Sequence, residues 1–344
     1  MKIFYTGLEN DHYAPKNGKS FEYNNFYLSL KGFPGAEVIY FPFEKILLEG
    51  KRKFNDDLLL AVKEQHPDLL FVFMYSDEFD TRILGELKKY TKTIAWFADD
   101  SWRFYNYSKY WAKYFTWAVT TYSWMPELYK KAGQPNVVRS QWAADPSVYK
   151  PQPALPASTV AFVGGKTPGR ERIIASLLAD GIKVETFGRG WAEGRISEEK
   201  MMGVFSNAKI NLALNPPPGM WTMNSVARLF LKPHANKIIP SFDIVGNVRS
   251  FFHQNIPQIK ARHFEIPACG GFIITSPADD IEKYYEPDKE IVLYRSYGEL
   301  KEKIRYYIAH ETERKKIAEA ARARTLRDHT YRKRFEEIFK AINL

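Results

Sequence analysis

An alternation of strand-like and helix-like segments, which occurs twice along the chain, limits the fold more than any other feature. In the first half, the apolar run PDLLFVFM at 67–74 is typical of a strand that is buried on both faces. An amphipathic segment at 80–90 and the strand-like TIAWFADD at 93–100 follow it. The alternation restarts with TVAFVGG at 159–165 and GRERIIASLLADG at 169–181. Alternation at this spacing predicts parallel sheets with helices on both faces.

A proline-rich segment separates the two alternating halves. Four prolines lie between Ala143 and Thr159, and proline at this density resists both helix and central strand. We therefore expect an α/β fold with two doubly wound, Rossmann-like domains that face a central cleft, since ligands in such sheets bind at the carboxyl ends of the strands. The predicted parts are an N-terminal domain at 1–143, a linker at 144–158, a second domain at 159–324, and a C-terminal helix at 325–344 that crosses back to the first domain.

The composition is sufficient to form hydrophobic cores. Apolar residues make up 45% of the sequence and aromatic residues 15%, which argues against global disorder. Cys269 is the only cysteine, so no intrachain disulfide can form and a reducing compartment is expected. The first residues lack the apolar core of a signal peptide, and no run reaches the roughly 18 apolar residues that span a membrane. These observations predict a cytoplasmic protein.

Positive charge is concentrated near the C-terminus. The net charge is +10, and residues 301–334 hold twelve Lys or Arg against five Asp or Glu. Three explanations stay open: a solvated helical face, attraction to an anionic membrane surface or glycolipid, and nucleic-acid binding. No groove-reading motif accompanies the charge, which argues against nucleic acid as a partner. The membrane explanation would place the protein at the inner face of the membrane.

Several common catalytic motifs are missing from the sequence. The stretch GGKTPGRER at 164–172 contains the glycine, lysine and threonine residue types of a P-loop, but not in the order G-x-x-x-x-G-K-[ST]. P-loop phosphoryl transfer is therefore not expected. No G-x-G-x-x-G follows the first strand, which argues against a dinucleotide-dependent dehydrogenase. The sequence also lacks a G-x-S-x-G elbow and a Cys/His cluster with zinc spacing, so we expect no bound metal.

The segment QIKARHFEIPACGGFIITS at 258–276 places charged residues directly before a tight turn and an apolar strand. If the residues before the glycine pair form a helix, Arg262 and Glu265 share one face of it. A carboxylate there could accept both hydroxyls of a ribose, and a guanidinium beside it could bind phosphate oxygens. The alternative is a surface ion pair, which contributes roughly 0.2–0.5 kcal/mol. Cys269 sits in an apolar setting and is expected to be inert.

Three residues are candidates for a general base. Asp99 and Asp100 end a strand that should be buried, and clustered carboxylates tend to have raised pKa values, which suits proton acceptance. Capping of the next segment or orientation of an acceptor would explain the same pair. His12, in the loop after the first strand, is the third candidate, and a surface histidine is its alternative. Aromatic residues are dense from Trp102 to Trp124 and could form either a sugar-stacking platform or a core.

These segments together resemble a known family. The stretches at 160–165, 170–191 and 206–215, the segment at 258–276 and the charged helices after it look like the C-terminal domain of group 1 glycosyltransferases of the CgeB-like, spore-maturation type. In the first half, IAWFADD and NVVRSQWAADPSVYKP are similar to the same family. The resemblance covers most of the chain outside the stretch 215–256, which has no clean period and is predicted to be a lid or an irregular insertion.

The resemblance implies a GT-B fold and a glycosyltransferase that moves a sugar from a nucleotide-diphosphate donor to the hydroxyl of a surface glycan, a glycolipid or a protein. The C-terminal domain would hold the donor, the N-terminal domain would hold the acceptor, and the nucleotide sugar would be a co-substrate, with no metal or other cofactor. Cations and backbone N–H groups would stabilise the leaving diphosphate, and Glu265 would hold the ribose. The expected donor site comprises Gly164, Gly165, Lys166, Arg170, Gly188, Arg262, Glu265, Gly270 and Gly271. A plain strand-to-helix turn with surface cations, and a glycine-rich strand exit at Gly188, are the alternatives.

One position departs from the family pattern. Relatives carry two glutamates separated by seven residues; Glu265 matches the second, whereas Pro257 stands at the position of the first. The departure leaves open whether transfer retains or inverts the sugar's configuration. It also leaves open a non-catalytic protein that binds nucleotides or sugars. A nucleotide-sugar epimerase or hydrolase of the same fold and a DNA-modifying glycosyltransferase are further alternatives.

Overall fold

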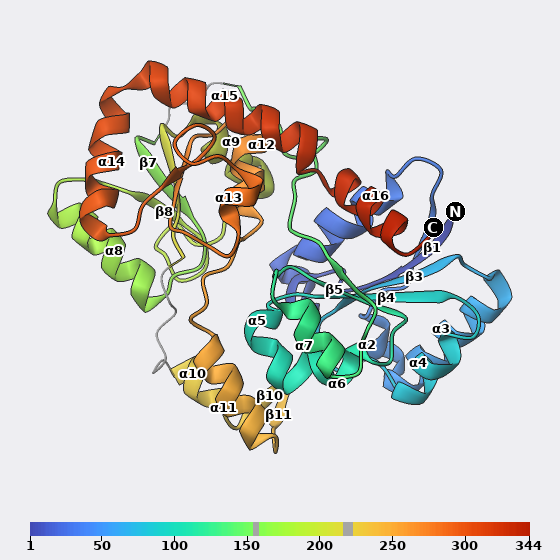
Figure 1. Ribbon diagram of the computed structural model, residues 1–344. Helices are drawn as coiled ribbons and strands as arrows, with labels where there is room; N and C mark the ends of the chain where they lie inside the picture. The colour runs from blue at the N-terminus through green and yellow to red at the C-terminus, as the bar shows by residue number, and fades with distance from the viewer. Residues whose placement is uncertain (154–157, 216–222) are drawn as a thin grey trace. The chain divides into compact units, whose positions relative to one another are not determined.

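The computed structural model describes residues 1–153, 158–215 and 223–344, which form two compact α/β units (Figure 1). Unit 1 comprises residues 1–141, 220–254 and 334–344, and unit 2 comprises residues 142–219 and 255–333. Residues 154–157 of the predicted linker and 216–222 of the predicted insertion lie outside the described residues.

Unit 1 is built on a six-stranded parallel sheet with the order β2-β1-β3-β4-β5-β6. All six residues of β3 are buried, which confirms the expectation that this apolar run forms a strand covered on both faces. The strands are β1 (Lys2–Thr6), β2 (Glu37–Tyr40), β3 (Leu69–Met74), β4 (Lys92–Phe97), β5 (Trp117–Thr120) and β6 (Val137–Arg139). The longer connecting helices are α2 (Lys45–Glu49), α3 (Lys51–Gln65), α4 (Thr81–Leu87) and α7 (Met125–Lys131), and shorter helical turns are η1 (Asp11–Tyr13), η2 (Pro15–Asn17), η3 (Tyr23–Tyr27) and α1 (Leu28–Lys31).

Aromatic side chains fill the core of unit 1. The fully buried Phe26 packs edge-on against Trp96, with ring centroids 4.8 Å apart. The C-terminal helix α16 (Tyr331–Ala341) adds Phe335, whose ring lies 6.0 Å from Phe26 and 5.8 Å from Phe71. Residues 334–344 therefore complete the core of unit 1, although they are distant from it in sequence.

Unit 2 is built on a five-stranded parallel sheet with the order β13-β12-β9-β7-β8. Helices α8 and α14 contribute to one buried cluster with the sheet, while α12 packs against α9 and α15. The strands are β7 (Val160–Val163), β8 (Glu185–Phe187), β9 (Ile210–Ala213), β12 (Ile273–Thr275) and β13 (Val292–Leu293). The helices are α8 (Pro168–Ala179), α9 (Glu198–Asn207), α12 (Arg262–Ala268), α13 (Ile281–Tyr284), α14 (Tyr297–Ala309) and α15 (Glu311–Asp328).

The insertion predicted at 215–256 folds, over its described residues, into a helix, a hairpin and a second helix. These are α10 (Met223–Ala227), the antiparallel strands β10 (Leu231–His234) and β11 (Lys237–Pro240), and α11 (Ile244–His253). α11 packs against α5 (Asp100–Arg103) and η4 (Phe104–Ser108), which α6 (Lys109–Ala112) follows. The contacts therefore group residues 220–254 with unit 1, whereas the sequence boundaries left them inside the domain at 159–324. No period in the sequence indicates this return, because the segment pairs with residues more than 100 positions away.

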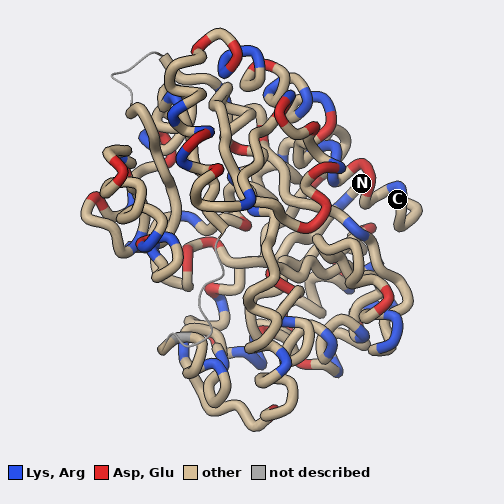
Figure 2. Tube along the Cα trace, turned by 60° about the vertical axis from the view of Figure 1, so that its left-hand side comes forward, with Lys and Arg blue, Asp and Glu red and all other residues tan. Residues whose placement is uncertain are grey.

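The cations of the C-terminal helices are interleaved with acidic residues (Figure 2). Within α15, Lys315 lies 2.7 Å from Glu311, and Arg324 lies 3.0 Å from Asp328. Such pairs are typical of a solvated helical face. No helix within the described residues is long and apolar enough to cross a membrane.

Candidate functional site

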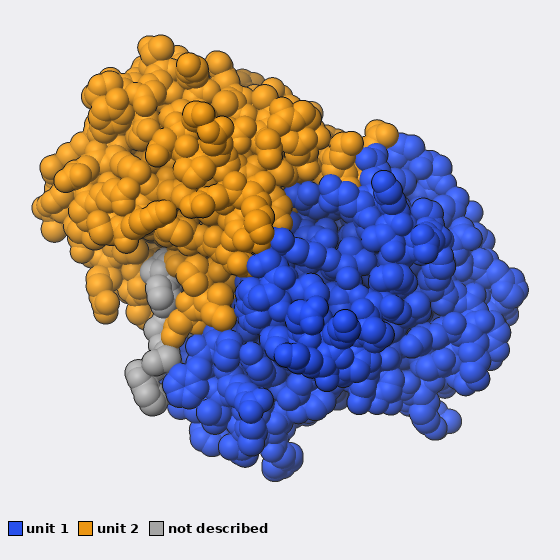
Figure 3. All heavy atoms as spheres, in the orientation of Figure 1, with its two compact units in different colours: residues 1–141, 220–254, 334–344 blue, residues 142–219, 255–333 orange. Residues whose placement is uncertain are grey.

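The carboxyl edge of the sheet in unit 2 (orange in Figure 3) carries most of the predicted donor residues. β7 ends at Val163, and Gly164, Gly165 and Lys166 form the turn that leads into α8. α8 begins at Pro168, and the side chain of Thr167 caps it by accepting a hydrogen bond from the backbone N–H of Arg170. The strand, the glycine turn and the capped helix follow in the predicted order, so backbone N–H groups and a positive dipole end lie at the ligand-binding edge of the sheet.

The two glycines Gly188 and Gly165 of this edge differ in how closely they are packed. Gly188, at the end of β8, has a φ of +125°, and a Cβ built on it would lie 2.4 Å from the carbonyl oxygen of Gly164. No other residue fits there without moving the backbone. Gly165 is less closely packed. A Cβ built on Gly165 would meet only the carbonyl oxygen of Arg189, at 4.0 Å. Gly188 therefore lets the ends of β7 and β8 approach each other, whereas packing does not require a glycine at Gly165.

Two arginines converge beside the glycine turn. The side chain of Arg170 donates to the carbonyl oxygens of Gly165 (2.8 Å) and Leu214 (3.0 Å). Arg262, at the start of α12, donates from Nε to the carbonyl oxygen of Val163 at 2.6 Å. Burial, and then the positive charge of Arg262, lower the pKa of Arg170. Two like charges held this close favour an anion between or beside them.

Glu265 lies under Arg262. Only 2% of its side chain is exposed, and its Oε2 lies 3.4 Å from Nη1 of Arg262, so the two residues share a helix face as predicted. Burial raises the pKa of Glu265, and the charge of Arg262 and a hydrogen bond from Tyr149 partly offset that rise. A ribose hydroxyl could reach this carboxylate only after a side-chain rearrangement, because the carboxylate is covered.

The structure does not bring Gly270 and Gly271 to this edge. Both precede β12, so they lie at the amino end of its strand, whereas Gly164 follows the carboxyl end of β7. A Cβ on Gly271 would meet the carbonyl oxygen of Phe205 at 2.3 Å, which gives this glycine a packing role. The pair is therefore not part of the candidate donor site; the sequence shows a glycine turn before a strand but not that this turn lies at the opposite edge of the sheet from Gly164.

Three further side chains lie in different environments. Lys166 lies 2.7 Å from Glu171 on the surface. His263 is buried, with Nε2 2.9 Å from the hydroxyl of Thr275, and burial lowers its pKa to about 4. Cys269 is buried and its pKa is raised to about 12 by that burial, in keeping with an inert thiol.

Unit 1 contains a pocket of about 630 Å³ at the carboxyl ends of β1, β3 and β4. Aromatic and charged side chains line most of it, and the insertion supplies one wall. The lining comprises His12, Tyr75, Asp77, Thr81, Asp99, Trp102, Arg103, Asn106, Tyr107, Tyr110, Trp111, Lys113, Tyr114, Arg228, Leu231, Lys232, Pro233, Ser241 and Asn247. The aromatic stretch after Trp102 thus divides: some of its rings line the pocket, while Phe104, Phe115 and Tyr122 are buried in the core.

Two of the three base candidates line this pocket. His12 is half exposed, and its Nδ1 lies 2.6 Å from the hydroxyl of Tyr75. Its Nε2 lies 3.7 Å from a carboxylate oxygen of Asp11. Asp99 follows β4, and both His12 and Asp99 adopt the left-handed backbone region, with φ of 55° and 56°. Strained backbone of this kind is concentrated at functional sites.

Asp100 lies elsewhere. It is fully buried and accepts a hydrogen bond from the hydroxyl of Tyr129 at 3.0 Å, and it is not part of the pocket lining. Burial raises the pKa of Asp100 to about 7, against the opposing effect of hydrogen bonds from Thr120 and Tyr129. Two adjacent residues at the end of one strand point to different environments, so the sequence could not separate the pocket residue from the core residue.

The raised pKa of Asp100 predicts a pH-dependent stability. The native state keeps the proton up to about pH 7, whereas the unfolded state releases it near pH 4, so this group lowers the free energy of unfolding as the pH rises from 4 to 7. A shift of this size corresponds to about 4 kcal/mol at most. The side chain of the Asp100→Asn variant does not titrate, so its free energy of unfolding should not fall through this group between pH 4 and pH 7. Urea unfolding of both proteins between pH 4 and pH 8 measures the difference, and parallel stability curves would show that Asp100 does not titrate in this way.

The sequence did not indicate Tyr75, Arg103 or Arg228 as site residues. Arg103 donates to the carbonyl oxygen of Tyr75 at 2.5 Å and stacks on the ring of Tyr107 at 4.1 Å. Arg228, from the insertion, lies 4.7 Å from the ring centroid of Trp102. Polar residues directly after the buried strand at 69–74 were a signal for Tyr75. Arg228 had none, because its place in the pocket depends on the return of the insertion to unit 1.

A buried carboxylate holds the loop after β3 in place. Glu78 accepts hydrogen bonds from the backbone N–H of Ser76 (2.7 and 2.9 Å) and from the hydroxyl of Tyr13 (3.0 Å). Burial raises its pKa, and these bonds oppose the rise. This network positions Tyr75 and Asp77 on the pocket wall.

Over residues 1–153, 158–215 and 223–344, no group of three or more His, Cys, Asp or Glu side chains could hold a metal ion.

Comparisons with known proteins give a family resemblance over part of the chain and a fold for the whole of it. Residues 170–340 match the family described as Glycosyl transferase-like. The fold is similar to that of sucrose-phosphate synthase (tll1590) from Thermosynechococcus elongatus, with a TM-score of 0.62 and 12% identity over 99% of this chain and 98% of that one. It is also similar to Anabaena Alr3699/HepE in complex with UDP, with a TM-score of 0.62 and 12% identity over 100% of both chains. The lipopolysaccharide outer core galactosyltransferase WaaB gives a TM-score of 0.55 at 12% identity, over 100% of this chain and 99% of that one. No curated protein matches the chain by sequence.

The fold is therefore the GT-B fold, with two Rossmann-like α/β domains. The family match covers 171 of the chain's 344 residues and marks residues 170–340 as similar to glycosyl transferases, while the likeness to solved structures at 12% identity shows the fold.

Proposed function

We propose that unit 2 binds the nucleotide-diphosphate sugar at the carboxyl edge of its sheet and that the pocket of unit 1 binds the acceptor hydroxyl. The donor's diphosphate would lie over Gly165, at the start of α8, with Arg170 and Arg262 beside it. The acceptor would lie among the aromatic rings of the pocket, with His12 and Asp99 on its wall. The acceptor is a glycan, a glycolipid or a protein.

The convergence of Arg170 and Arg262 carries this proposal. A guanidinium has five N–H donors; two of those in Arg170 are used by the carbonyl oxygens of Gly165 and Leu214. The remaining donors are fixed in direction by these two bonds and suit phosphate oxygens. Because the group is already held in place, it loses little freedom when a ligand binds.

The same cations supply what the reaction needs at the leaving group. Negative charge grows on the diphosphate as the bond between the sugar and phosphate breaks, and preorganised cations and N–H groups stabilise that charge. We propose that Arg170, Arg262 and the start of α8 do this without a metal ion. A general base on the unit 1 wall would accept the proton of the acceptor hydroxyl if the reaction inverts the sugar's configuration.

Two finer assignments also belong to the proposal. HepE has been solved in complex with UDP and in complex with UDP-glucose, so uridine nucleotides are the first donors to test. Membership of the CgeB-like type rests on the motifs of the sequence, including FGRGW and the segment around Glu265. The protein would act at the cytoplasmic side of the membrane.

The role of Glu265 can be tested with nucleotides that differ in the ribose. If its carboxylate holds the ribose hydroxyls, UDP should bind to wild type about 10-fold more tightly than 2′,3′-dideoxy-UDP, since hydrogen bonds to a charged group contribute roughly 1.5–3 kcal/mol. Glu265→Gln should lose that preference. Titration calorimetry of both nucleotides with both proteins gives the four affinities.

Two other outcomes have definite meanings. If Glu265→Gln weakens both nucleotides equally, Glu265 positions Arg262 and the ribose assignment is wrong. If both affinities are unchanged, neither role holds.

Activity assays separate the alternative functions. Conversion of a nucleotide sugar without any acceptor would favour an epimerase or hydrolase, and binding without turnover across many acceptors would favour a non-catalytic protein.

A further inference from the structure

Helix α11 of the insertion exposes most of its apolar side chains and buries mainly small and polar residues. Its side chains Ile244, Val245, Val248 and Phe252 are exposed, and Val245 keeps 67% of its surface. The face that packs inward carries Gly246, Asn247, Ser250 and Phe251. A surface helix of a globular protein normally buries its apolar stripe and exposes its polar one. Here most of the apolar stripe faces outward.

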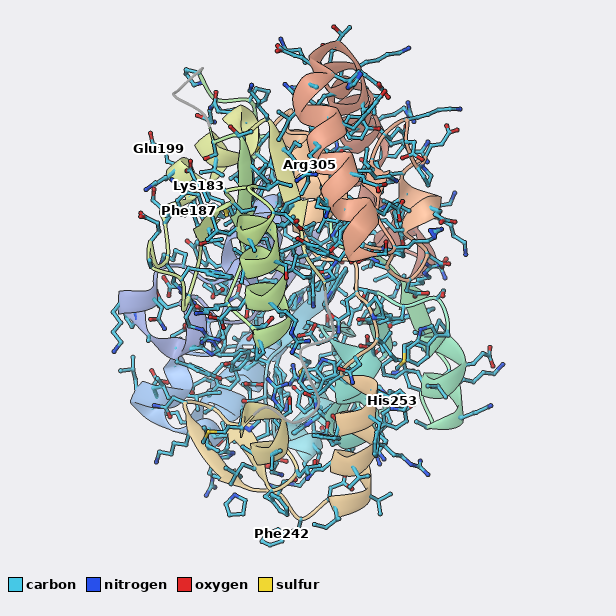
Figure 4. The ribbon with its side chains drawn as sticks, turned by 90° about the vertical axis from the view of Figure 1, so that its left-hand side faces the viewer. Lys183, Phe187, Glu199, Phe242, His253 and Arg305 are labelled. Carbon is cyan, nitrogen blue, oxygen red and sulfur yellow. The ribbon has the colours of Figure 1, made fainter. Side chains whose placement is uncertain are left out.

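Neighbouring residues of the insertion extend the exposed apolar surface. Phe242, two residues before α11, is 91% exposed, and its ring points away from the ribbon (Figure 4). Ile238 on β11 is 73% exposed, and Phe230 and Met223 are also exposed. We call these residues and the outer face of α11 the apolar tip; it comprises Met223, Phe230, Ile238, Phe242, Ile244, Val245, Val248 and Phe252. Single exposed apolar residues are ordinary, whereas the eight of the apolar tip, within residues 223–252, are typical of an interaction surface.

Polar contacts on the inner face fix this orientation. The side chain of Asn247 donates to the carbonyl oxygen of Leu229 and to the hydroxyl of Ser241, and it accepts from Asn106 at 2.9 Å. A Cβ on Gly246 would lie 2.6 Å from the carbonyl oxygen of Tyr105, so the helix backbone is seated directly on η4. Turning the apolar face inward would break these contacts and bury a less complementary surface. The outward apolar face is therefore built into the packing of the insertion.

The charges around the apolar tip identify its partner. Between 223 and 256 the cations are Arg228, Lys232, Lys237 and Arg249, of which the first two line the pocket of unit 1, and Asp243 is the single carboxylate. Asp243 caps α11 and accepts a hydrogen bond from Tyr110. Contact with a second copy through this face would set like charges against each other. Apolar side chains flanked by Lys and Arg instead match the headgroups and acyl boundary of an anionic bilayer.

We propose that the apolar tip docks this enzyme on an anionic lipid bilayer. Phe242 and the outer face of α11 enter the boundary between headgroups and acyl chains, and Lys237 and Arg249 contact the lipid phosphates. This contact differs from the one expected from the sequence, because it uses the insertion and not the charged C-terminal helices.

The docking surface and the pocket share one segment, which bears on the acceptor. Arg228, Leu231 and Lys232 line the pocket of unit 1, and they flank the apolar tip in sequence. An enzyme docked by this insertion presents the adjoining pocket wall next to the lipid surface. The acceptor is therefore a lipid-borne glycan or another lipid-linked hydroxyl compound. This second step rests on the proposed function, whereas the docking itself does not.

Vesicle sedimentation tests the docking directly. Wild type should bind vesicles of phosphatidylglycerol and phosphatidylcholine in equal parts and should not bind phosphatidylcholine vesicles. Phe242→Ser combined with Val245→Ser should weaken binding to the anionic vesicles about 10- to 100-fold, because two large apolar side chains no longer enter the lipid. Leu48→Ser is the matched control: Leu48 is 84% exposed on α2 of the same unit, and its loss should leave binding unchanged.

Three results would overturn the proposal. Wild type could fail to sediment with either vesicle, the double variant could sediment as wild type does, or ultracentrifugation could show a dimer that the double variant loses, which would assign the surface to a second copy. The substituted side chains are exposed, so thermal melting should stay unchanged and rule out unfolding. Nucleoside diphosphate binding should also be the same in the double variant, so a failure of the donor site and a failure of docking are separate results.

Discussion

The double variant His12→Asn/Asp99→Asn should transfer sugar about 10²–10⁴ times more slowly than wild type, the range that a general base contributes. Both residues line the pocket of unit 1, and both adopt left-handed backbone angles, which asparagine tolerates better than most residues. The substitutions remove the imidazole and the carboxylate while keeping hydrogen-bonding side chains in place. Release of nucleoside diphosphate from the nucleotide sugar, in the presence of an acceptor that supports wild-type turnover, measures the rate.

The single variants then identify the group. If His12→Asn alone gives the loss, His12 is the base, and Asp99→Asn serves as its control; the reverse result assigns Asp99. Donor affinity should stay unchanged in all three proteins, because the donor site is proposed to lie in unit 2. A double variant that keeps its rate within about threefold, far less than a base contributes, would show that no base lies on this wall.

Arg170→Met should weaken the binding of UDP about 100-fold. The guanidinium would be lost along with charge-assisted hydrogen bonds to the diphosphate, which contribute roughly 1.5–3 kcal/mol. Methionine keeps a long side chain over Phe162, whose ring lies 5.3 Å from the guanidinium carbon. Titration calorimetry at two salt concentrations measures the loss and should show a weaker salt dependence than wild type.

Arg172→Met is the matched control for this change. Arg172 lies two residues further along α8 and is exposed, so it carries the same charge on the same helix away from the glycine turn. Its loss should change UDP affinity by less than about twofold, as is usual for an exposed charge. Equal effects of the two variants would mean that only the general positive charge of unit 2 matters, and the diphosphate assignment of Arg170 would be lost.

The fold could be predicted from the sequence because its signals are local. Apolar runs such as 69–74 and the alternating helices between them determine parallel sheets without knowledge of distant contacts. The arrangement of Gly164, Gly165 and Arg170 was also predictable, since a strand, a glycine turn and a helix follow one another directly in the chain.

The parts that could not be predicted depend on contacts between distant residues. Arg228 enters the pocket because the insertion returns to unit 1, and Asn106 bonds to Asn247 across 141 positions. Asp99 and Asp100 are adjacent in the chain, yet one lines the pocket and the other lies in the core. The side on which α11 exposes its apolar face likewise depends on its polar contacts with η4 and not on its own period.

Donor binding by the wild-type protein is the most direct test of the central claim. Thermal unfolding should be followed with nucleoside diphosphates and nucleotide sugars of each base, uridine first. A ligand at about 100 times its dissociation constant stabilises the native state by roughly 2.7 kcal/mol. For a chain of this size, that raises Tm by about 2–4 °C. A rise with one base family, absent in Arg170→Met, is the predicted result. No rise with any of them at millimolar concentration would contradict the assignment of a donor site in unit 2.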